Sequence, residues 1–205
     1  YNVGQTHVRR GSYFEARKWF ELALVRVAID ADTGTSATLN VVRVHHNLGH
    51  CLYRLGKNEG AMRSYQKALH LAKKYKLGAF YEAAATNAIG VLLFHKDPSE
   101  ATKALGLFQQ SISVYRAYFG SNSGEVATIL NNIGRVHYLK AEYGLSLTVY
   151  KLALVIRRKV LGSESIDVAA TICNTGQAHN QCGDFDKAMK FYKAFLAMAE
   201  RRLGS

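Results

Sequence analysis

The chain has 205 residues, of which 48% are hydrophobic and 20% are charged, and this composition excludes an intrinsically disordered protein. No apolar run reaches the roughly 18 residues that a membrane span needs, and one proline with 17 glycines provides too few turn residues for a β-sandwich. The net charge of +12 attracts acidic peptides, nucleic acid and anionic membranes alike, so charge alone does not choose among these partners.

A pair of residues recurs five times along the chain: a small residue followed four positions later by an aromatic one. The pairs are Ala16/Phe20, Ala61/Tyr65, Ala104/Phe108, Ser146/Tyr150 and Ala188/Tyr192. Their first members are 45, 43, 42 and 42 residues apart, and units of this length must stack to bury an apolar face. We therefore predict a single repeat domain over 1–205, with repeats at 1–34 (partial), 35–78, 79–120, 121–162 and 163–205.

Each repeat is predicted to be a pair of antiparallel helices joined by a short turn. A glycine precedes each small residue, and five such glycines in register indicate places where another helix approaches too closely for a side chain. These are Gly4, Gly49, Gly90, Gly134 and Gly176. The second helix is expected to end at a glycine in the left-handed conformation, at Gly78, Gly120, Gly162 and Gly204.

These features together resemble the tetratricopeptide repeat family, whose pattern places Ala-x3-Phe/Tyr-x2-Ala after a turn. The resemblance covers nearly the whole chain, although the usual repeat has 34 residues and a closing proline. Repeats of about 42 residues, with the motifs at 128–134 and 156–162, look like those of kinesin light chains, whereas 68–73 looks more like Pins-type adaptors. The resemblance implies an all-α, right-handed superhelical solenoid of about five repeats, the first of them truncated.

The resemblance also implies a ligand site on the first helix of each repeat. In the family, ligand contacts come from positions three before the glycine and one, four and five after it. Those positions, with nearby basic residues, form a candidate peptide-binding groove here: Arg9, Arg43, His46, His50, Tyr53, Arg54, Asn87, Phe94, His95, Asn131, Arg135, Tyr138, Gln177 and Asn180.

A basic stripe distinguishes this groove. Its members are spaced by 3, 4 and 4 residues on one predicted helix face: Arg43, His46, His50 and Arg54. The stripe is either an ordinary solvated surface or, together with Arg9, His95 and Arg135, the wall of a positive groove. In the second case we expect it to select a peptide carrying Asp, Glu or phosphate, because arginine makes charge-assisted bonds to such groups.

Two further sets of groove residues leave two interpretations open. Tyr53, Phe94 and Tyr138 share one register, and they either pack between neighbouring helices as core or receive ligand side chains. Asn87 and Asn131 carry amides that either bind the backbone of an extended peptide or link neighbouring repeats, since an amide both donates and accepts hydrogen bonds.

Catalysis and metal binding find little support in the sequence. His46 and His50 share a helix face but have no acidic ligand nearby, and Cys173, His179 and Cys182 point to different sides of a helix. No phosphate-binding loop, nucleophile elbow or zinc-protease motif occurs. We expect a chain that is not an enzyme and that holds no metal and no cofactor.

The predicted function is that of a protein-interaction scaffold or adaptor, which captures an acidic or phosphorylated segment of a partner protein. The alternative is single-stranded nucleic-acid binding by the same basic groove. The odd number of cysteines fits reduced thiols and a cytoplasmic location, and no membrane association is expected. Because the chain begins within a predicted helix, we expect a fragment of a longer protein, and its open ends offer surfaces for self-association.

Overall fold

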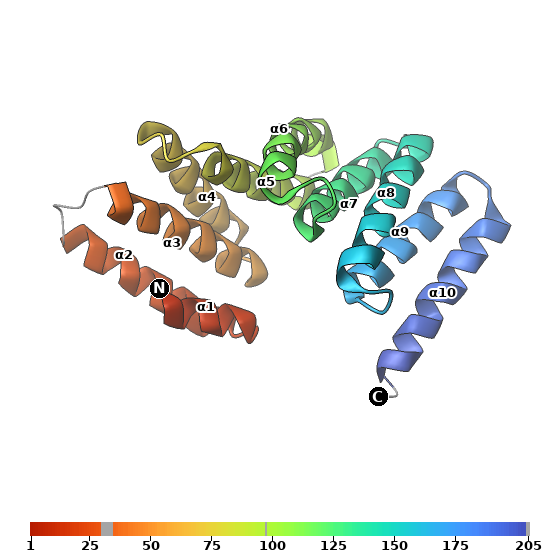
Figure 1. The fold of residues 1–205 in the computed structure, drawn as a ribbon, viewed down its shortest axis with the longest axis horizontal. Coiled ribbons are helices and arrows are strands. Elements are labelled where there is room, and N and C mark those ends of the chain that lie inside the picture. Colours follow the sequence, from red (N-terminus) through yellow and green to blue (C-terminus); the bar gives the residue numbers. More distant parts are fainter. Residues whose placement is uncertain (30–34, 97, 204–205) are drawn as a thin grey trace. The chain divides into compact units, whose positions relative to one another are not determined.

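The computed structural model describes residues 1–29, 35–96 and 98–203, and within them every regular element is a helix (Figure 1). The helices are α1 (Asn2–Arg9), α2 (Tyr13–Ile29), α3 (Thr35–Arg54), α4 (Asn58–Lys74), α5 (Ala79–Lys96), the 3₁₀ turn η1 (Pro98–Glu100), α6 (Ala101–Phe119), α7 (Gly124–Leu139), α8 (Tyr143–Leu161), α9 (Ile166–Gln181) and α10 (Phe185–Leu203). The predicted all-α fold is confirmed. Along these helices, no segment combines the length and the hydrophobicity of a bilayer span.

The chain forms two compact units, Tyr1–Asp97 and Pro98–Ser205, which we call the N-unit and the C-unit. In the N-unit, each helix from α1 to α5 packs on the next one along the chain. In the C-unit, the same is true from α6 to α10. Packing between successive helices is the arrangement of a repeat array. The helix bounds place one pair in each predicted repeat range, and the grouping of all repeats into one domain stays a prediction.

The recurring glycines and aromatic residues pack on each other within a repeat. A Cβ atom added to Gly49 would lie 2.7 Å from the ring of Tyr65, and one added to Gly134 would lie 2.5 Å from the ring of Tyr150. The same close contact occurs in the first and last repeats, at Gly4/Phe20 and Gly176/Tyr192. The predicted close approach is confirmed for these four glycines and stays a prediction for Gly90, and the approaching atoms belong to the aromatic ring of the second helix.

The second helices α6 and α8 end at glycines, but the backbone of these glycines differs from our expectation. Helix α4 ends earlier, at Lys74 with Tyr75 as its C-cap, so the expected helix end at Gly78 was wrong. Gly120 and Gly162 have φ angles of 83° and 80°, and both have a ψ angle of 157°. The left-handed helical conformation has ψ near about 47°, so the expected conformation was wrong for these two residues. The observed region of positive φ and extended ψ is essentially restricted to glycine, which explains the residue type. Gly204 lies outside the described residues.

Candidate functional site

The basic stripe lies along α3 of the N-unit, with an arginine at each end and two histidines between them. Arg43 and Arg54 are exposed, whereas His46 and His50 are partly buried. Burial, and then the proximity of His50, lowers the pKa of His46 to about 4. Burial, and then the charge of Arg54, lowers the pKa of His50. Because His46 is neutral at pH 7, the charge of the stripe comes mainly from its arginines and less from its histidines than we expected.

Each arginine of the stripe lies over a tyrosine ring. The Cζ atom of Arg43 is 4.8 Å from the centroid of the Tyr1 ring, and that of Arg54 is 4.6 Å from the centroid of the Tyr13 ring. These are cation–π contacts, which restrain a guanidinium while leaving its N–H groups able to bind an anion. We call the four stripe residues together with the two tyrosines the α3 face.

Tyr1 and Tyr13 are members of the α3 face that the sequence analysis missed. The hydroxyl oxygen of Tyr1 accepts hydrogen bonds from Gln5 Nε2 at 2.7 Å and from Asn47 Nδ2 at 2.9 Å, so its ring is held in place. A signal for Tyr1 was present, since it lies three residues before Gly4, and the same position is a predicted ligand contact in the other repeats. Tyr13 begins α2 and does not occupy any of the groove positions.

The three aromatic groove residues differ in their burial. Phe94 is 7% exposed and belongs to the core. Tyr53 is partly buried against the core of the N-unit, with its ring centroid 5.9 Å from that of the exposed His95. Tyr138 of the C-unit is also partly buried, 5.6 Å from the ring of Tyr143. The core interpretation therefore holds for Phe94, while Tyr53 and Tyr138 keep an exposed part that a ligand can contact.

The two asparagine side chains, Asn87 and Asn131, differ in their hydrogen bonding. Asn131 on α7 is 7% exposed, and its Oδ1 atom accepts a hydrogen bond from Asn174 Nδ2 of α9 at 3.3 Å. This amide links neighbouring repeats. On α5, the Oδ1 atom of Asn87 is buried and has no hydrogen-bond partner among the described residues. The acceptor of Asn131 is thus used between repeats, and a contact of Asn87 with a ligand stays a prediction.

The remaining predicted groove residues are spread over three helices. Arg9 is exposed on α1, Arg135 is partly buried on α7, and Gln177 and Asn180 are exposed on α9. The predicted residues up to His95 belong to the N-unit and the later ones to the C-unit. The structure brings together the α3 face, and a single groove through all repeats stays a prediction.

The described part of the chain contains no group of three or more His, Cys, Asp or Glu side chains placed to hold a metal ion. The thiols of Cys51, Cys173 and Cys182 are free. Burial raises the pKa of the Cys51 thiol to about 11, so this side chain stays protonated and unreactive at neutral pH. The α3 face itself presents two exposed arginines, two tyrosine rings and two partly buried histidines.

Two family models of the tetratricopeptide repeat match this chain. One repeat model matches residues 42–75, and another matches residues 81–154 and 125–201, so that more than half of the chain is covered. A comparison with curated proteins finds no match for this sequence.

Solved structures with a similar fold include BtubC (BKLC) from P. vanneervenii, with a TM-score of 0.80 and 19% identity over 99% of this chain and 79% of that one. A putative kinesin light chain of Podosopora anserina with nearly identical TPR-like repeats has a TM-score of 0.68 and 16% identity, over 100% and 95%. The Rap conjugation gene regulator of the plasmid pLS20, in complex with the Phr* peptide, has a TM-score of 0.72 and 17% identity, over 97% and 52%. At these identities the likeness shows the fold, a solenoid of helical repeats.

Proposed function

Because this chain belongs to the tetratricopeptide repeat family, we propose that it is a non-catalytic interaction scaffold whose α3 face binds an acidic or phosphorylated segment of a partner protein. Stacked repeats of this kind offer extended surfaces, and binding to such a surface needs no reactive group. We also propose a cytoplasmic location, with which the free thiols agree.

The observation that carries this proposal is the pair of exposed arginines over tyrosine rings at the two ends of the α3 face. An arginine guanidinium binds carboxylate or phosphate through two parallel N–H bonds, and a ring beneath it reduces the freedom that is lost on binding. The neutral His46 between the arginines adds no charge that a ligand must match. The face therefore suits a ligand with two separated anionic groups.

The spacing of the two arginines sets the expected spacing of those anions. Arg43 and Arg54 are eleven residues apart on α3, which corresponds to about 16 Å along a helix axis. An extended peptide advances about 3.3 Å per residue, so acidic groups about five residues apart span the same length. The fold supports peptide capture at a general level, since a Rap regulator of similar fold was solved with the Phr* peptide.

The test is fluorescence anisotropy with a labelled peptide that carries two glutamates five residues apart, compared with a peptide of the same composition in which the glutamates are adjacent. We expect Arg54→Glu to weaken binding of the spaced peptide by about tenfold or more, because an attractive contact becomes a repulsive one. Arg63→Glu is the matched control, since Arg63 is an exposed arginine on α4 outside the α3 face. Equal losses in both variants, or no preference between the peptides, would contradict the proposal.

Single-stranded nucleic acid is the second candidate ligand, and the exposed arginines beside partly buried tyrosine rings favour it because bases stack on aromatic rings and on guanidinium groups. Anisotropy with a single-stranded RNA over a range of salt concentrations separates the two ligands. Tighter binding of RNA than of the spaced peptide, with a steep loss as salt is added, would replace the peptide by RNA.

Self-association through an outer face of the array is a separate proposal. Phe185, Met189 and Leu196 on α10 are 67%, 53% and 55% exposed. Exposed apolar side chains gathered on one helix mark an interaction surface. Sedimentation velocity tests it: a dimer that dissociates on Leu196→Lys supports the proposal, and a monomer at all concentrations contradicts it.

A further inference from the structure

Helix α8 of the C-unit has one side in the core and large apolar side chains on its opposite side. On the inner side, Leu154 is 8% exposed and packs in one cluster with residues of α9 and α10. On the outer side, Leu145, Leu152 and Val155 are 55%, 46% and 59% exposed. Their spacings of seven and three residues put these three side chains on one face of the helix. We call the three residues the α8 apolar face.

The exposure of this face does not come from a neighbouring helix that is absent. Helix α8 packs on α7 and on α9, which are the helices before and after it in the chain. Both sequence neighbours are therefore in place, and the outer side of α8 still presents two leucines and a valine. Large apolar side chains gathered on one exposed face mark an interaction surface.

The repeat architecture does not require apolar residues at these positions. When the recurring pairs of small and aromatic residues are aligned, the other second helices of the C-unit have small or polar residues there, all of them exposed. They are Lys103, Gln110 and Ser113 on α6 and Lys187, Ala194 and Ala197 on α10. The large apolar side chains at this register are thus a particular property of α8 within the C-unit.

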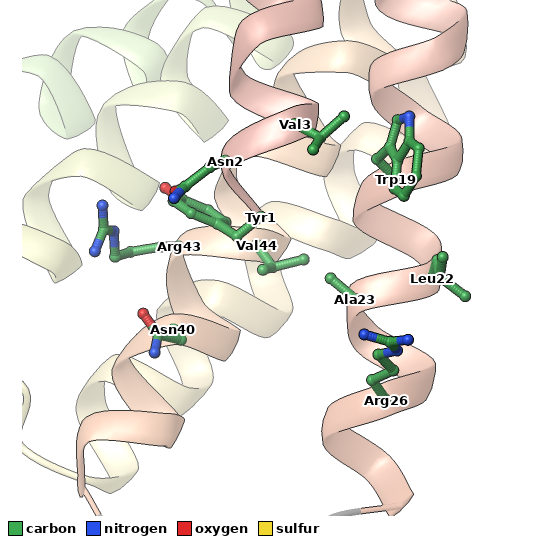
Figure 2. A pocket seen from close by; sticks show the side chains of 10 residues that line it. All are labelled: Tyr1, Asn2, Val3, Trp19, Leu22, Ala23, Arg26, Asn40, Arg43 and Val44. Carbon is green, nitrogen blue, oxygen red and sulfur yellow. The ribbon is translucent and has the colours of Figure 1, made fainter.

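In the N-unit, α2 has similar apolar residues but a different charge. Leu22 and Val25 are 48% and 57% exposed, at the positions that correspond to the last two residues of the α8 apolar face. Figure 2 shows Leu22 with Arg26 further along α2. The same helix also carries Glu15 and Glu21. Because α2 bears charges of both signs, it does not favour a partner of one charge.

The charge of α8 is of one sign. The helix Tyr143–Leu161 contains no Asp or Glu. Lys151 and Arg158 are exposed and seven residues apart, so they lie together along one edge of the apolar face. Lys159, seven residues after Leu152, is exposed and continues the face at the end of the helix. The outer side of α8 therefore combines an apolar surface with a positive edge.

We propose that the α8 apolar face binds an amphipathic helix of a partner protein, one whose apolar side is bordered along one edge by Asp or Glu. Leu145 and Val155 are ten residues apart, which corresponds to about 15 Å of helix axis, or about three turns of a partner helix. Apolar side chains of the two helices would pack together, and Lys151 with Arg158 would face the acidic edge. This site is on the C-unit and does not depend on the α3 face of the N-unit.

Charge and shape argue against two other occupants. The α8 helix of a second copy would bring the same cations towards Lys151 and Arg158, and like charges oppose binding. Helices that bind in a membrane surface typically carry Trp or Phe on the apolar side, and the α8 apolar face has neither. Its apolar surface is also one helix wide, because the equivalent residues of α6 and α10 are small or polar.

The test is fluorescence anisotropy with a designed helical peptide. The probe is a capped, labelled, alanine-based peptide of about five helical turns, with leucines on one face and glutamates along one edge of them. The comparison peptide has lysine in place of every glutamate. We expect saturable binding of the glutamate peptide to the whole chain, and binding of the lysine peptide that is weaker by about tenfold or more.

One pair of variants tests the apolar face. Leu152→Glu is expected to weaken binding of the glutamate peptide by about tenfold, in line with the loss of one buried apolar contact. Leu139→Glu is the matched control, because Leu139 is 45% exposed and ends α7 instead of lying on α8. Circular dichroism of each variant checks its helix content, and Leu145→Glu replaces Leu152→Glu if the latter loses helix.

A second pair of variants tests the positive edge. Lys151→Glu is expected to reduce the preference for the glutamate peptide over the lysine peptide by several-fold. Lys193→Glu is its matched control, because Lys193 is exposed at the equivalent register position of α10 and makes the same change in net charge.

Three results would overturn the proposal: no preference for the glutamate peptide, equal losses in Leu152→Glu and Leu139→Glu, or equal effects of Lys151→Glu and Lys193→Glu. A dimer of the unliganded protein that dissociates on Leu152→Glu would assign the face to a second copy. Cosedimentation with phosphatidylserine vesicles that Leu152→Glu abolishes would assign it to a membrane. Arg54→Glu is expected to leave binding of the glutamate peptide unchanged, so failure of this site is distinguishable from failure of the peptide site on the α3 face.

Discussion

The N-unit and the C-unit differ at the place where the second helix of a repeat packs on the first helix of the next. Ala72 and Ala85 occupy this place in the N-unit, and both are fully buried. Arg157 and Thr171 occupy the equivalent positions in the C-unit. There, Arg157 is 3% exposed, and its Nη1 atom donates hydrogen bonds of 2.7 Å to Thr171 Oγ1 and to the backbone oxygen of Asp167. The same contact between neighbouring repeats is thus made by two alanine methyl groups in the N-unit and by a buried arginine with a threonine in the C-unit.

The first helices of the two units show a second difference. Three residues before the repeat glycine, α3 has His46 and α7 has Asn131. Burial keeps His46 neutral between two exposed arginines, whereas Asn131 is hydrogen-bonded to Asn174 of α9. The N-unit therefore has a neutral histidine between two exposed arginines at this position, while the corresponding amide of the C-unit joins two repeats. Equal register does not imply equal function.

The largest expected effect comes from removing the buried cation of the C-unit. Arg157→Ala leaves Thr171 Oγ1 without the donor that it accepts from, while the backbone oxygen of Asp167 keeps its hydrogen bond from the Thr171 hydroxyl. Because the substitution also opens a cavity, we expect a loss of about 3–5 kcal/mol in the free energy of unfolding. Urea denaturation followed by circular dichroism measures it. Arg157→Met is the control that keeps most of the volume without the charge, and it should cost clearly less. A loss below about 1 kcal/mol for Arg157→Ala would show that the hydrogen bonds contribute little net stability.

The second largest loss of stability is expected from filling the glycine–aromatic contact, which both units contain. Gly134→Ala places a methyl group 2.5 Å from the ring of Tyr150, and Gly49→Ala places one 2.7 Å from the ring of Tyr65. We expect losses of about 2–3 kcal/mol for Gly134→Ala and somewhat less for Gly49→Ala, because overpacking outweighs the gain in helix propensity. Thermal unfolding of both variants measures which substitution destabilises the protein more. Stabilisation by either substitution would mean that the rings move aside freely.

As the pH drops, the loss of folding stability should begin in the N-unit. The pKa of His46 is about 4 in the folded chain and 6.5 when exposed, so the unfolded chain binds more protons between these values and stability falls as the pH drops through this range. From pH 7 to pH 5 the expected loss is about 2 kcal/mol. In the C-unit, hydrogen bonds with Lys140 and then His137 lower the pKa of Glu142, so this carboxylate loses its stabilising effect only at a lower pH.

Urea denaturation at pH 7, 6 and 5 measures the acid response. His46→Phe keeps an aromatic ring beside Tyr65 and removes the titration, so its stability should fall less over this range than that of the unaltered chain. The histidines His45 and His50, whose pKa values are also lowered by burial, should account for part of the remaining slope. An identical slope in the variant would mean that His46 is already neutral in the unfolded chain or protonated in the folded one.

The smallest change in stability is expected in the turns that join the two helices of a repeat. In the turn between α7 and α8, Ala141 has a φ angle of 57°. In the equivalent turn between α3 and α4, Gly56 has a φ angle of 72°. A residue with a Cβ atom costs about 1–2 kcal/mol in this conformation. Glycine removes this cost, but it also makes the unfolded chain more flexible, which offsets part of the gain. We expect Ala141→Gly to stabilise by about 0.5–1 kcal/mol and Gly56→Ala to destabilise by about 1 kcal/mol. Differential scanning calorimetry resolves both, and the same sign for the two substitutions would contradict the explanation.

The helix pairs were predictable from the sequence because their determinants are local. The small and aromatic residues of a pair are four positions apart on one helix, and the glycine that receives the ring is on the preceding helix of the same repeat, as in Gly49 and Tyr65. The ends of the helices were less predictable, since Gly120 combines a positive φ with an extended ψ that residue type alone does not specify.

The sequence by itself determined the repeat register, the all-α fold and the arginines that stay exposed, Arg43 and Arg54, because these follow from spacing along a helix. The tertiary structure alone decided that His46 is neutral, that Asn131 is bonded to Asn174 and that tyrosine rings lie beneath the arginines. The physical reason is that desolvation and hydrogen bonding depend on atoms contributed by other helices, and those distances are set by packing between repeats rather than by spacing within one.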